Sequence, residues 1–152
     1  MRAVIQRVKH AEVIIANQSH ASIAHGLLVL LGIEAADTSE DVIWLCNKII
    51  SMRIFSDQQD LMNHSVLDVA GEILLVSQFT LFAQTKKGNR PSFIQAAKPE
   101  LAMPIYEQTI VHFTQLMPNK IKTGVFGADM ELQLSNDGPV TIIMDTNDKE
   151  RH

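Results

Sequence analysis

Cysteine is almost absent from this sequence, which has 152 residues and a single cysteine, Cys46. One cysteine excludes an internal disulfide and suits a reducing compartment. Long apolar runs are missing too, since no stretch could span a bilayer and residues 1–7 lack the apolar core of a signal peptide. We therefore expect a cytoplasmic protein without a membrane partner.

An excess of positive charge is also lacking. The chain holds 13 Lys and Arg against 17 Asp and Glu, which gives a net charge of −4. Proteins that grip a long nucleic-acid backbone usually carry a basic stripe, so we expect no DNA partner and, at most, local contacts with nucleic acid. The candidate patch is Lys86, Lys87 and Arg90, for which the pattern alone favours a solvated loop.

The sequence contains no spacing that is typical of a metal or nucleotide site. Its six histidines form no HxxxH or HExxH pair, and CxxC is absent. Gly-x-Ser-x-Gly, GxGxxG and a P-loop are missing as well. We expect no metal and no cofactor. A Ser/His/Asp triad built from distant residues stays open, although nothing points to one.

What is present fits one ordinary domain over residues 1–145, followed by a polar tail, residues 146–152, that we expect to be flexible. Alternating or continuous apolar residues predict a series of strands. The predicted strands cover residues 2–9, 12–16, 26–33, 72–78 with an apolar extension to Phe82, 130–134 and 140–144.

Two helices are expected between these strands. The first spans about residues 39–53 and has Cys46 in its apolar stripe, where a buried small residue is favoured over a reactive thiol. The second begins near Pro99 and ends before Pro118, and Pro104 should kink it or delay its start. This order predicts a mixed α/β fold in which sheet layers pack against two main helices.

Composition leaves two segments unexplained. In one, an apolar strand runs into Ser77-Gln78-Phe79-Thr80, where polar side chains and free backbone N–H groups at a strand end can meet a ligand. In the other, Asn136-Asp137-Gly138-Pro139 separates two apolar runs and resembles a hairpin turn. Pattern alone favours an ordinary strand end and an ordinary hairpin. Against the hairpin, the proline removes a ladder donor where the returning strand should begin.

At these residues the sequence resembles the D-aminoacyl-tRNA deacylases. The matching stretches follow the family's order and together cover about residues 1–145. They are residues 1–8 (MRAVIQRV), 26–32 (GLLVLLG), 76–81 (VSQFTL), 88–93 (GNRPSF), 124–130 (GVFGADM) and 136–141 (NDGPVT).

The resemblance implies a homodimer that hydrolyses the ester between a D-amino acid and the 3′-terminal adenosine of tRNA, without metal or cofactor. Glycine mischarged on tRNA belongs to the same implied substrate set. It also implies β/β/α layering and a cis Gly138-Pro139 bond that each subunit inserts into its partner's site.

Site roles follow from the resemblance and the chemistry. We expect Ser77, Gln78, Phe79 and Thr80 to be the catalytic segment, with backbone N–H groups around Phe79 and Thr80 forming an oxyanion hole. We expect Thr80 to act mainly through its backbone and rank a nucleophilic role of its hydroxyl second. A threonine hydroxyl needs a partnered base, and none is visible near it in sequence.

Substrate binding and chiral selection are assigned to a second set of residues. Carbonyl groups at the Gly-Pro corner should accept hydrogen bonds from the α-amino group, so that an L side chain meets main chain. Arg7 should support the corner through its carbonyls, and Phe126 and Met130 should line the adenosine end. The set comprises Arg7, Phe126, Met130, Asn136, Gly138 and Pro139.

The sequence departs from the family's pattern in residues 57–64, which lack a frequent Gly-Lys pair, and at Pro104. Neither departure touches the two site segments. Two other functions stay open: a non-catalytic dimeric module that binds RNA ends, and an editing hydrolase for L-amino acids.

Overall fold

The computed structural model describes residues 1–86 and 88–151. Its helices are α1 (Ser39–Ser51) and α2 (Pro99–Leu116), with 3₁₀ turns η1 (Phe79–Phe82) and η2 (Thr146–Arg151). Its strands are β1 (Arg2–Ile15), β2 (Gln18–Ile23), β3 (Gly26–Gly32), β4 (Phe55–Ser56), β5 (Met62–His64), β6 (Glu72–Ser77), β7 (Ile121–Thr123) and β8 (Glu131–Asp145). Neither helix in this described part is long and apolar enough to cross a bilayer.

The main sheet runs in the order β2-β1-β3-β6-β7, and β8 pairs with β1. The pairs β3–β6 and β6–β7 are parallel, whereas β1 is antiparallel to all of its neighbours. The predicted mixed α/β class is confirmed. Residues 2–9 and 12–15 are strand as predicted, but their division into two strands is wrong, because β1 is continuous. One edge of β1 pairs first with β3 and then with β2. Residues 54–70, which lie between the predicted elements, contain the short β4–β5 pair.

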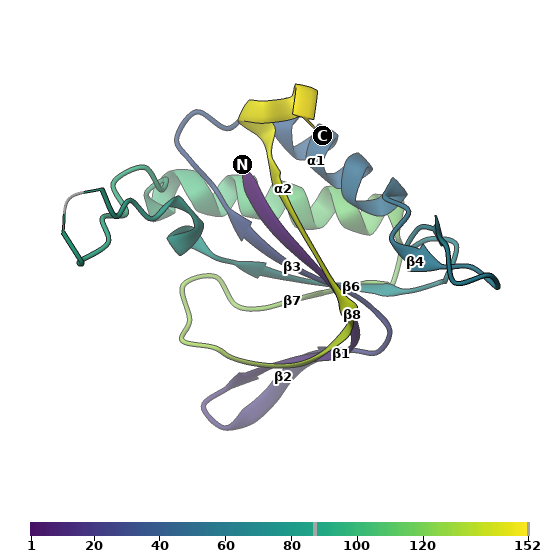
Figure 1. Cartoon of the computed structure of the whole chain (residues 1–152). Coiled ribbons are helices and arrows are strands. Elements are labelled where there is room, and N and C mark those ends of the chain that lie inside the picture. Colours follow the sequence, from purple (N-terminus) through teal and green to yellow (C-terminus); the bar gives the residue numbers. More distant parts are fainter. Residues whose placement is uncertain (87, 152) are drawn as a thin grey trace.

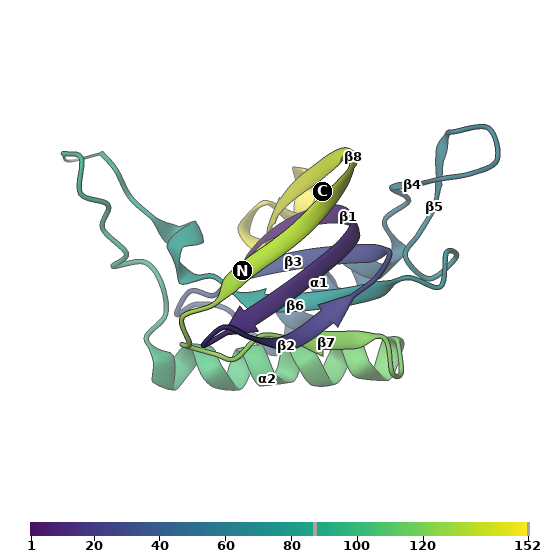
Figure 2. The same cartoon turned by 90° about the horizontal axis from the view of Figure 1, so that it is seen from below.

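Three layers result from the bending of β1 and β8 (Figures 1 and 2). The central strands β3 and β6 are buried on both faces, as their continuous apolar runs predict. Leu27, Val29 and Leu31 pack on the helix side, and Leu28 packs on the opposite side against the outer halves of β1 and β8. The layering is therefore β/β/α.

Both helices lie on one face of the sheet (Figure 1). The first buries the expected stripe, including Cys46, which has no exposed surface. The second begins at Pro99 and continues through Pro104, so the expected delay is wrong. Pro104 is exposed, whereas Tyr106 and Phe113 on the inner face anchor α2 to the sheet.

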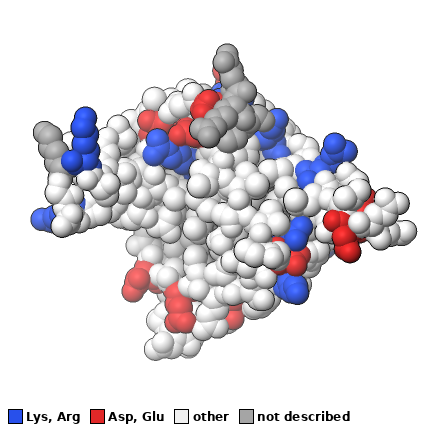
Figure 3. Space-filling view, viewed as in Figure 1, with Lys and Arg blue, Asp and Glu red and all other residues white. Residues whose placement is uncertain are grey.

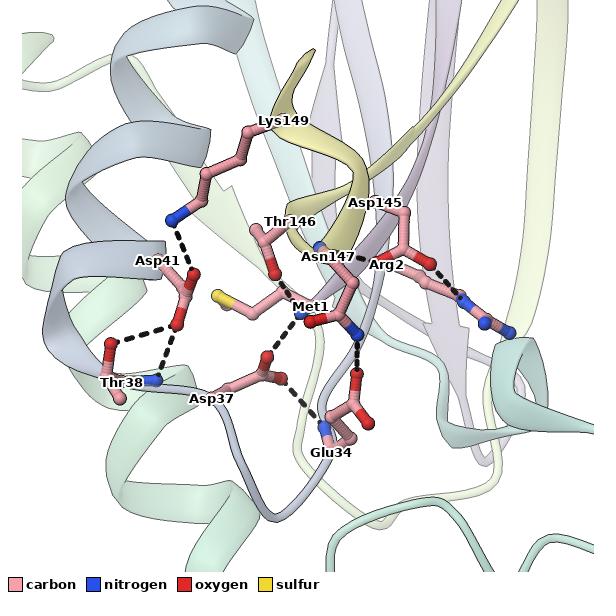
Figure 4. A network of polar contacts seen from close by, with 10 residues as sticks. All are labelled: Met1, Arg2, Glu34, Asp37, Thr38, Asp41, Asp145, Thr146, Asn147 and Lys149. Atoms are coloured by element: carbon pink, nitrogen blue, oxygen red, sulfur yellow. Dashed lines mark hydrogen bonds and ion pairs between the residues drawn. The ribbon is translucent and has the colours of Figure 1, made fainter. Parts of the chain in front are cut away.

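The segment expected to be a flexible tail forms η2 as far as Arg151, and His152 lies outside the described residues. The α-amino group of Met1 contacts Asp37 and Thr146 (Figure 4). Thr146 is almost fully buried. Lys149 of η2 forms an ion pair with Asp41 of α1, with Nζ and Oδ1 2.8 Å apart. These contacts attach the end of the chain to both β1 and α1.

Cys46 gives the first testable prediction. Burial raises the pKa of its thiol to about 12, so almost no thiolate forms at neutral pH. We expect a thiol reagent such as DTNB at about pH 8 to label Cys46 only after unfolding in urea. Rapid labelling of the native protein would show that this helix face opens to solvent.

Asp145 gives a prediction about pH. Burial raises the pKa of its carboxyl, but hydrogen bonds from Arg2 and from the backbone N–H of Asn147 outweigh that effect and hold the pKa below 3.8. The group therefore stabilises the fold above the unfolded-state pKa, and this stabilisation is lost as the pH falls through the lowered folded-state pKa. Asp145→Asn should lower the free energy of unfolding by about 0.5–1 kcal/mol at neutral pH.

This difference should begin to shrink below about pH 4, where Asp145 becomes protonated in the unfolded chain, and should vanish once the pH falls below the lowered folded-state pKa. Urea unfolding of both proteins across this range is the measurement. Glu107→Gln, an exposed change on α2, is the matched control and should show little difference at either pH. An equal loss for Asp145→Asn at every pH would contradict the argument.

Candidate active site

Strand β6 ends at Ser77, and the chain then turns into η1. The N–H of Gln78 donates to the carbonyl of Leu31 at 2.7 Å, which is the last backbone bond of the strand. Phe82 is buried, and the guanidinium of Arg2 lies 4.6 Å from its ring centroid. The strand predicted over residues 72–78 is confirmed to within one residue, and the apolar residues that continue to Phe82 belong to η1.

The turn leaves two adjacent backbone donors without an acceptor. Within the described residues, the N–H groups of Phe79 and Thr80 have no hydrogen-bond partner, whereas those of Leu81 and Ala83 bond back to Gln78 and Thr80. A pair of neighbouring N–H groups is the arrangement that stabilises a developing oxyanion. The two N–H groups that the sequence assigns to an oxyanion hole are therefore free to bind a ligand, and that role stays a prediction.

The hydroxyl of Thr80 has a different partner from the one that a nucleophile needs. The side-chain amide of Gln78 donates to its Oγ1. No carboxylate, imidazole or amine contacts that hydroxyl in the described part of the chain. This environment positions the Thr80 hydroxyl but does not activate it.

A cavity of about 570 Å³ opens beside this turn, at the carboxyl ends of β3 and β6. It brings together five of the predicted site residues, whereas Thr80, Arg7 and the Gly-Pro corner do not line it. The lining comprises Leu31, Ile33, Val76, Ser77, Gln78, Phe79, Phe93, Ala96, Ala97, Pro99, Ala102, Phe126, Gly127, Ala128, Asp129, Met130 and Leu132.

Packing explains the shape of the inner wall of the cavity. The ring of Phe126 packs 5.7 Å from that of Tyr106, whose hydroxyl donates to the carbonyl of Leu75 at 3.0 Å. Burial raises the pKa of Tyr106, so the hydroxyl stays protonated. A side chain at Gly124 would place its Cβ 2.6 Å from the sulfur of Met130, so glycine there allows Met130 to reach the cavity.

Phe93 and Asp129 were missed by sequence reasoning. Phe93 lies two residues after Pro91, and its ring centroid lies 5.2 Å from that of Phe79 at an interplanar angle of 77°. Both rings stand partly in solvent at the rim of the cavity. The available signals were the stretches 88–93 and 124–130, which belong to the family pattern and contain Phe93 and Asp129, but neither residue was given a role.

The Gly-Pro corner is a bulge in one continuous strand. Gln6 pairs with Thr141 and Val8 pairs with Asn136, so residues 137–140 lie opposite a single residue of β1. The Gly138–Pro139 peptide bond is cis. The hairpin that pattern alone favours is wrong, because both arms pair with the same strand.

Arg7 is the residue opposite this bulge, and it is buried. Its Nε donates to the carbonyl of Asp137 at 3.1 Å and lies 3.1 Å from the carboxylate Oδ2 of the same residue. Its Nη1 donates to the carbonyl of Ile54, and His25 Nε2 lies 3.6 Å from Oδ2 of Asp137. Arg7 thus contacts the carbonyl immediately before Gly138, while Asn136 accepts a hydrogen bond from Gln6 at 3.4 Å.

Within one chain, the cavity and the Gly-Pro corner lie far apart. Arg7 pairs with Leu27 at the start of β3, whereas Ser77 pairs with Leu31 near its end. Four residues along the strand correspond to about 13 Å, and three strand spacings between β8 and β6 add roughly 14 Å across the sheet. Figure 1 shows η1 and the bend of β8 toward opposite ends of the sheet.

The described residues contain no group of three His, Cys, Asp or Glu side chains that could hold a metal ion. Of the acidic side chains, only Asp129 lines the cavity. The cavity can therefore bind a partly apolar ligand by shape and by backbone donors, with few charged contacts.

Comparison with known proteins relates this chain to one family. Residues 4–145 match the family described as D-Tyr-tRNA(Tyr) deacylase. The D-aminoacyl-tRNA deacylases of Cytophaga hutchinsonii and Flavobacterium johnsoniae are 61% and 58% identical over 150 residues, which is 99% of this chain and 100% of each relative.

A solved structure of the c-Myc DNA unwinding element binding protein is 39% identical and superimposes with a TM-score of 0.91. The similarity covers 96% of this chain and 99% of that one. The agreement of sequence and fold over the whole length places this chain in the D-Tyr-tRNA(Tyr) deacylase family.

Proposed function

We propose that this protein hydrolyses the ester bond of D-aminoacyl-tRNA in the cytoplasm and releases the D-amino acid and free tRNA. The observation that carries the proposal is the pair of unpartnered N–H groups of Phe79 and Thr80 next to a cavity lined by Ser77, Gln78 and Met130. Membership of the deacylase family supports the same reaction.

The chemistry asks little of the protein, because an aminoacyl ester is already activated. Water attacks the carbonyl carbon, the bond to the ribose 3′-oxygen breaks, and that oxygen leaves with a proton. The N–H groups of Phe79 and Thr80 stabilise the oxyanion, and Ser77 and Gln78 hydrogen-bond the ribose or the ester. The 2′-hydroxyl of the substrate positions the attacking water, so Thr80 acts chiefly through its backbone.

A homodimer completes the site in this proposal. The Gly-Pro corner of one chain lies too far from its own cavity but is exposed and can enter the cavity of a partner. Strand β8 pairs only with β1 among the described strands, which leaves a long free edge. Ile143 and Leu134 on β8 are 65% and 37% exposed, so the strand offers apolar surface to a second copy.

Chiral selection then follows from main-chain contacts. Carbonyl groups at Gly138 and Pro139 of the partner hold the α-amino group of the substrate. An L side chain would meet backbone, whereas a D side chain points to solvent and glycine has nothing to exclude. The proposal therefore includes glycine mischarged on tRNA and a broad range of D side chains as substrates.

The main alternative is a non-catalytic module that binds RNA ends. Incubation with D-tyrosyl-tRNA and with L-tyrosyl-tRNA separates the candidates, because we expect rapid loss of the D ester only. Stable D ester would favour the binding module, and loss of the L ester would indicate an editing hydrolase for L-amino acids.

The oxyanion donors can be tested by removing one of them. Proline at position 79 deletes one N–H, and Phe79 is the first residue of η1, a helical position whose N–H makes no intrahelical bond and which tolerates proline. Phe79→Pro should lower kcat by about 10²–10³-fold, whereas the control Phe79→Leu keeps the N–H and should retain most of the wild-type kcat.

Thr80→Ala should also stay active, because the proposal assigns no chemical role to the Thr80 hydroxyl. Complete loss of turnover in folded, tRNA-binding Thr80→Ala would restore Thr80 as the nucleophile.

The shared site can be tested by mixing two defective variants. An alanine at Gly138, where φ is +122°, would bring its Cβ within 3.1 Å of the Arg7 guanidinium and distort the corner. Heterodimers of Gly138→Ala and Phe79→Pro contain one intact site if each site uses both chains. Random mixing should then restore about a quarter of wild-type activity.

If each chain instead holds a complete site, the mixture stays as inactive as its components. Size-exclusion chromatography of both variants provides the control, because each must remain a folded dimer for the comparison to hold.

A further inference from the structure

The connection between η1 and α2, residues 83–98, has an unusual charge. It contains four basic residues, Lys86, Lys87, Arg90 and Lys98, and no acidic residue. The rest of the chain holds nine Lys and Arg against seventeen Asp and Glu. An acidic protein therefore concentrates positive charge in one loop, which begins where the proposed oxyanion turn ends.

Little in the fold explains these charges. Lys86, Arg90 and Lys98 are exposed, and none of them forms an ion pair or side-chain hydrogen bond within the described residues. Figure 3 shows basic side chains where this loop projects from the body of the protein, with no acidic atoms beside them on that face. By contrast, Arg2 and Arg7 each have an acidic partner.

The same loop supplies half of an aromatic rim. Phe93 packs edge-to-face on Phe79, and both rings line the mouth of the cavity. Phe79 is 57% exposed and Phe93 is 36% exposed, so ring surface remains open to a ligand. The antiparallel bridge between Gln84 and Ser92 closes the base of the loop one residue before Phe93.

Exposed aromatic rings beside unpaired cations are what proteins use to bind single-stranded nucleic acid. Bases stack on the rings and phosphates contact Lys and Arg, largely without regard to sequence. We infer that residues 83–98, together with Phe79, bind the unpaired nucleotides that precede the terminal adenosine of tRNA. The inference rests on the proposed function, since the cavity must hold the esterified adenosine for the preceding phosphates to reach the loop.

The test compares two substrates that share the reacting ester: D-tyrosyl-tRNA and D-tyrosyl-adenosine, which lacks the preceding nucleotides. The double variant Lys86→Gln/Arg90→Gln removes two positive charges. Its KM for D-tyrosyl-tRNA should rise about tenfold at low salt with little change in kcat. The slope of log kcat/KM against log salt concentration should fall by about 1.4, or about 0.7 for each lost phosphate contact.

The Lys86→Gln/Arg90→Gln variant should turn over D-tyrosyl-adenosine at a rate close to that of the wild type. Phe93→Leu should weaken binding of a single-stranded RNA tetranucleotide that carries no amino acid by about tenfold. The matched control Lys48→Gln/Lys122→Gln removes two exposed charges from other elements and should leave the salt slope unchanged.

Four results separate the failures. If the wild type hydrolyses neither substrate, the proposed function is wrong and this inference falls with it. If it hydrolyses both and the loop variants behave like the control, only the inference fails. An equal loss on both substrates would assign the loop to the cavity itself. A change in oligomeric state of the loop variant would assign it to a subunit contact, which also overturns RNA binding.

Discussion

The parallel pair β3–β6 is the constraint on which the rest of the structure depends. Its side chains are buried on both faces, so helices must cover one side and the bent halves of β1 and β8 must cover the other. The two strands also approach closely, since a Cβ at Gly26 would lie 2.0 Å from the carbonyl of Glu72. The cavity lies at the carboxyl ends of these two strands.

Strand β1 is shared between the two sheet layers. Each half of β1 pairs with β8, while its other edge passes from β3 to β2. The strand therefore bends around the core. Opposite Arg7, strand β8 has four residues, 137–140, where β1 has one. This is why the Gly-Pro corner projects from the middle of a strand and lies far from its own cavity.

Much of this was predictable from local sequence. The buried runs of β3 and β6 and both helices follow from apolar spacing. The two site segments were singled out by the family resemblance, since pattern alone favours an ordinary strand end and an ordinary hairpin. The continuity of β1, the bulge at residues 137–140 and the inward turn at Phe82 did not follow. These features depend on which strands pair and on what fills the core, and a local pattern does not contain that information. Phe93 was missed for the same reason, because its role depends on a contact with Phe79.

The bulge at Gly138-Pro139 has an implication for affinity. Because both of its arms are held by β1 and its base by Arg7, its position is fixed when the chain folds. A corner carried on a free loop would lose conformational entropy each time a ligand arrived, which commonly weakens binding. Here that entropy is already lost when the chain folds. In the proposed function, the free energy of each contact to the α-amino group can therefore appear as discrimination between mirror-image substrates.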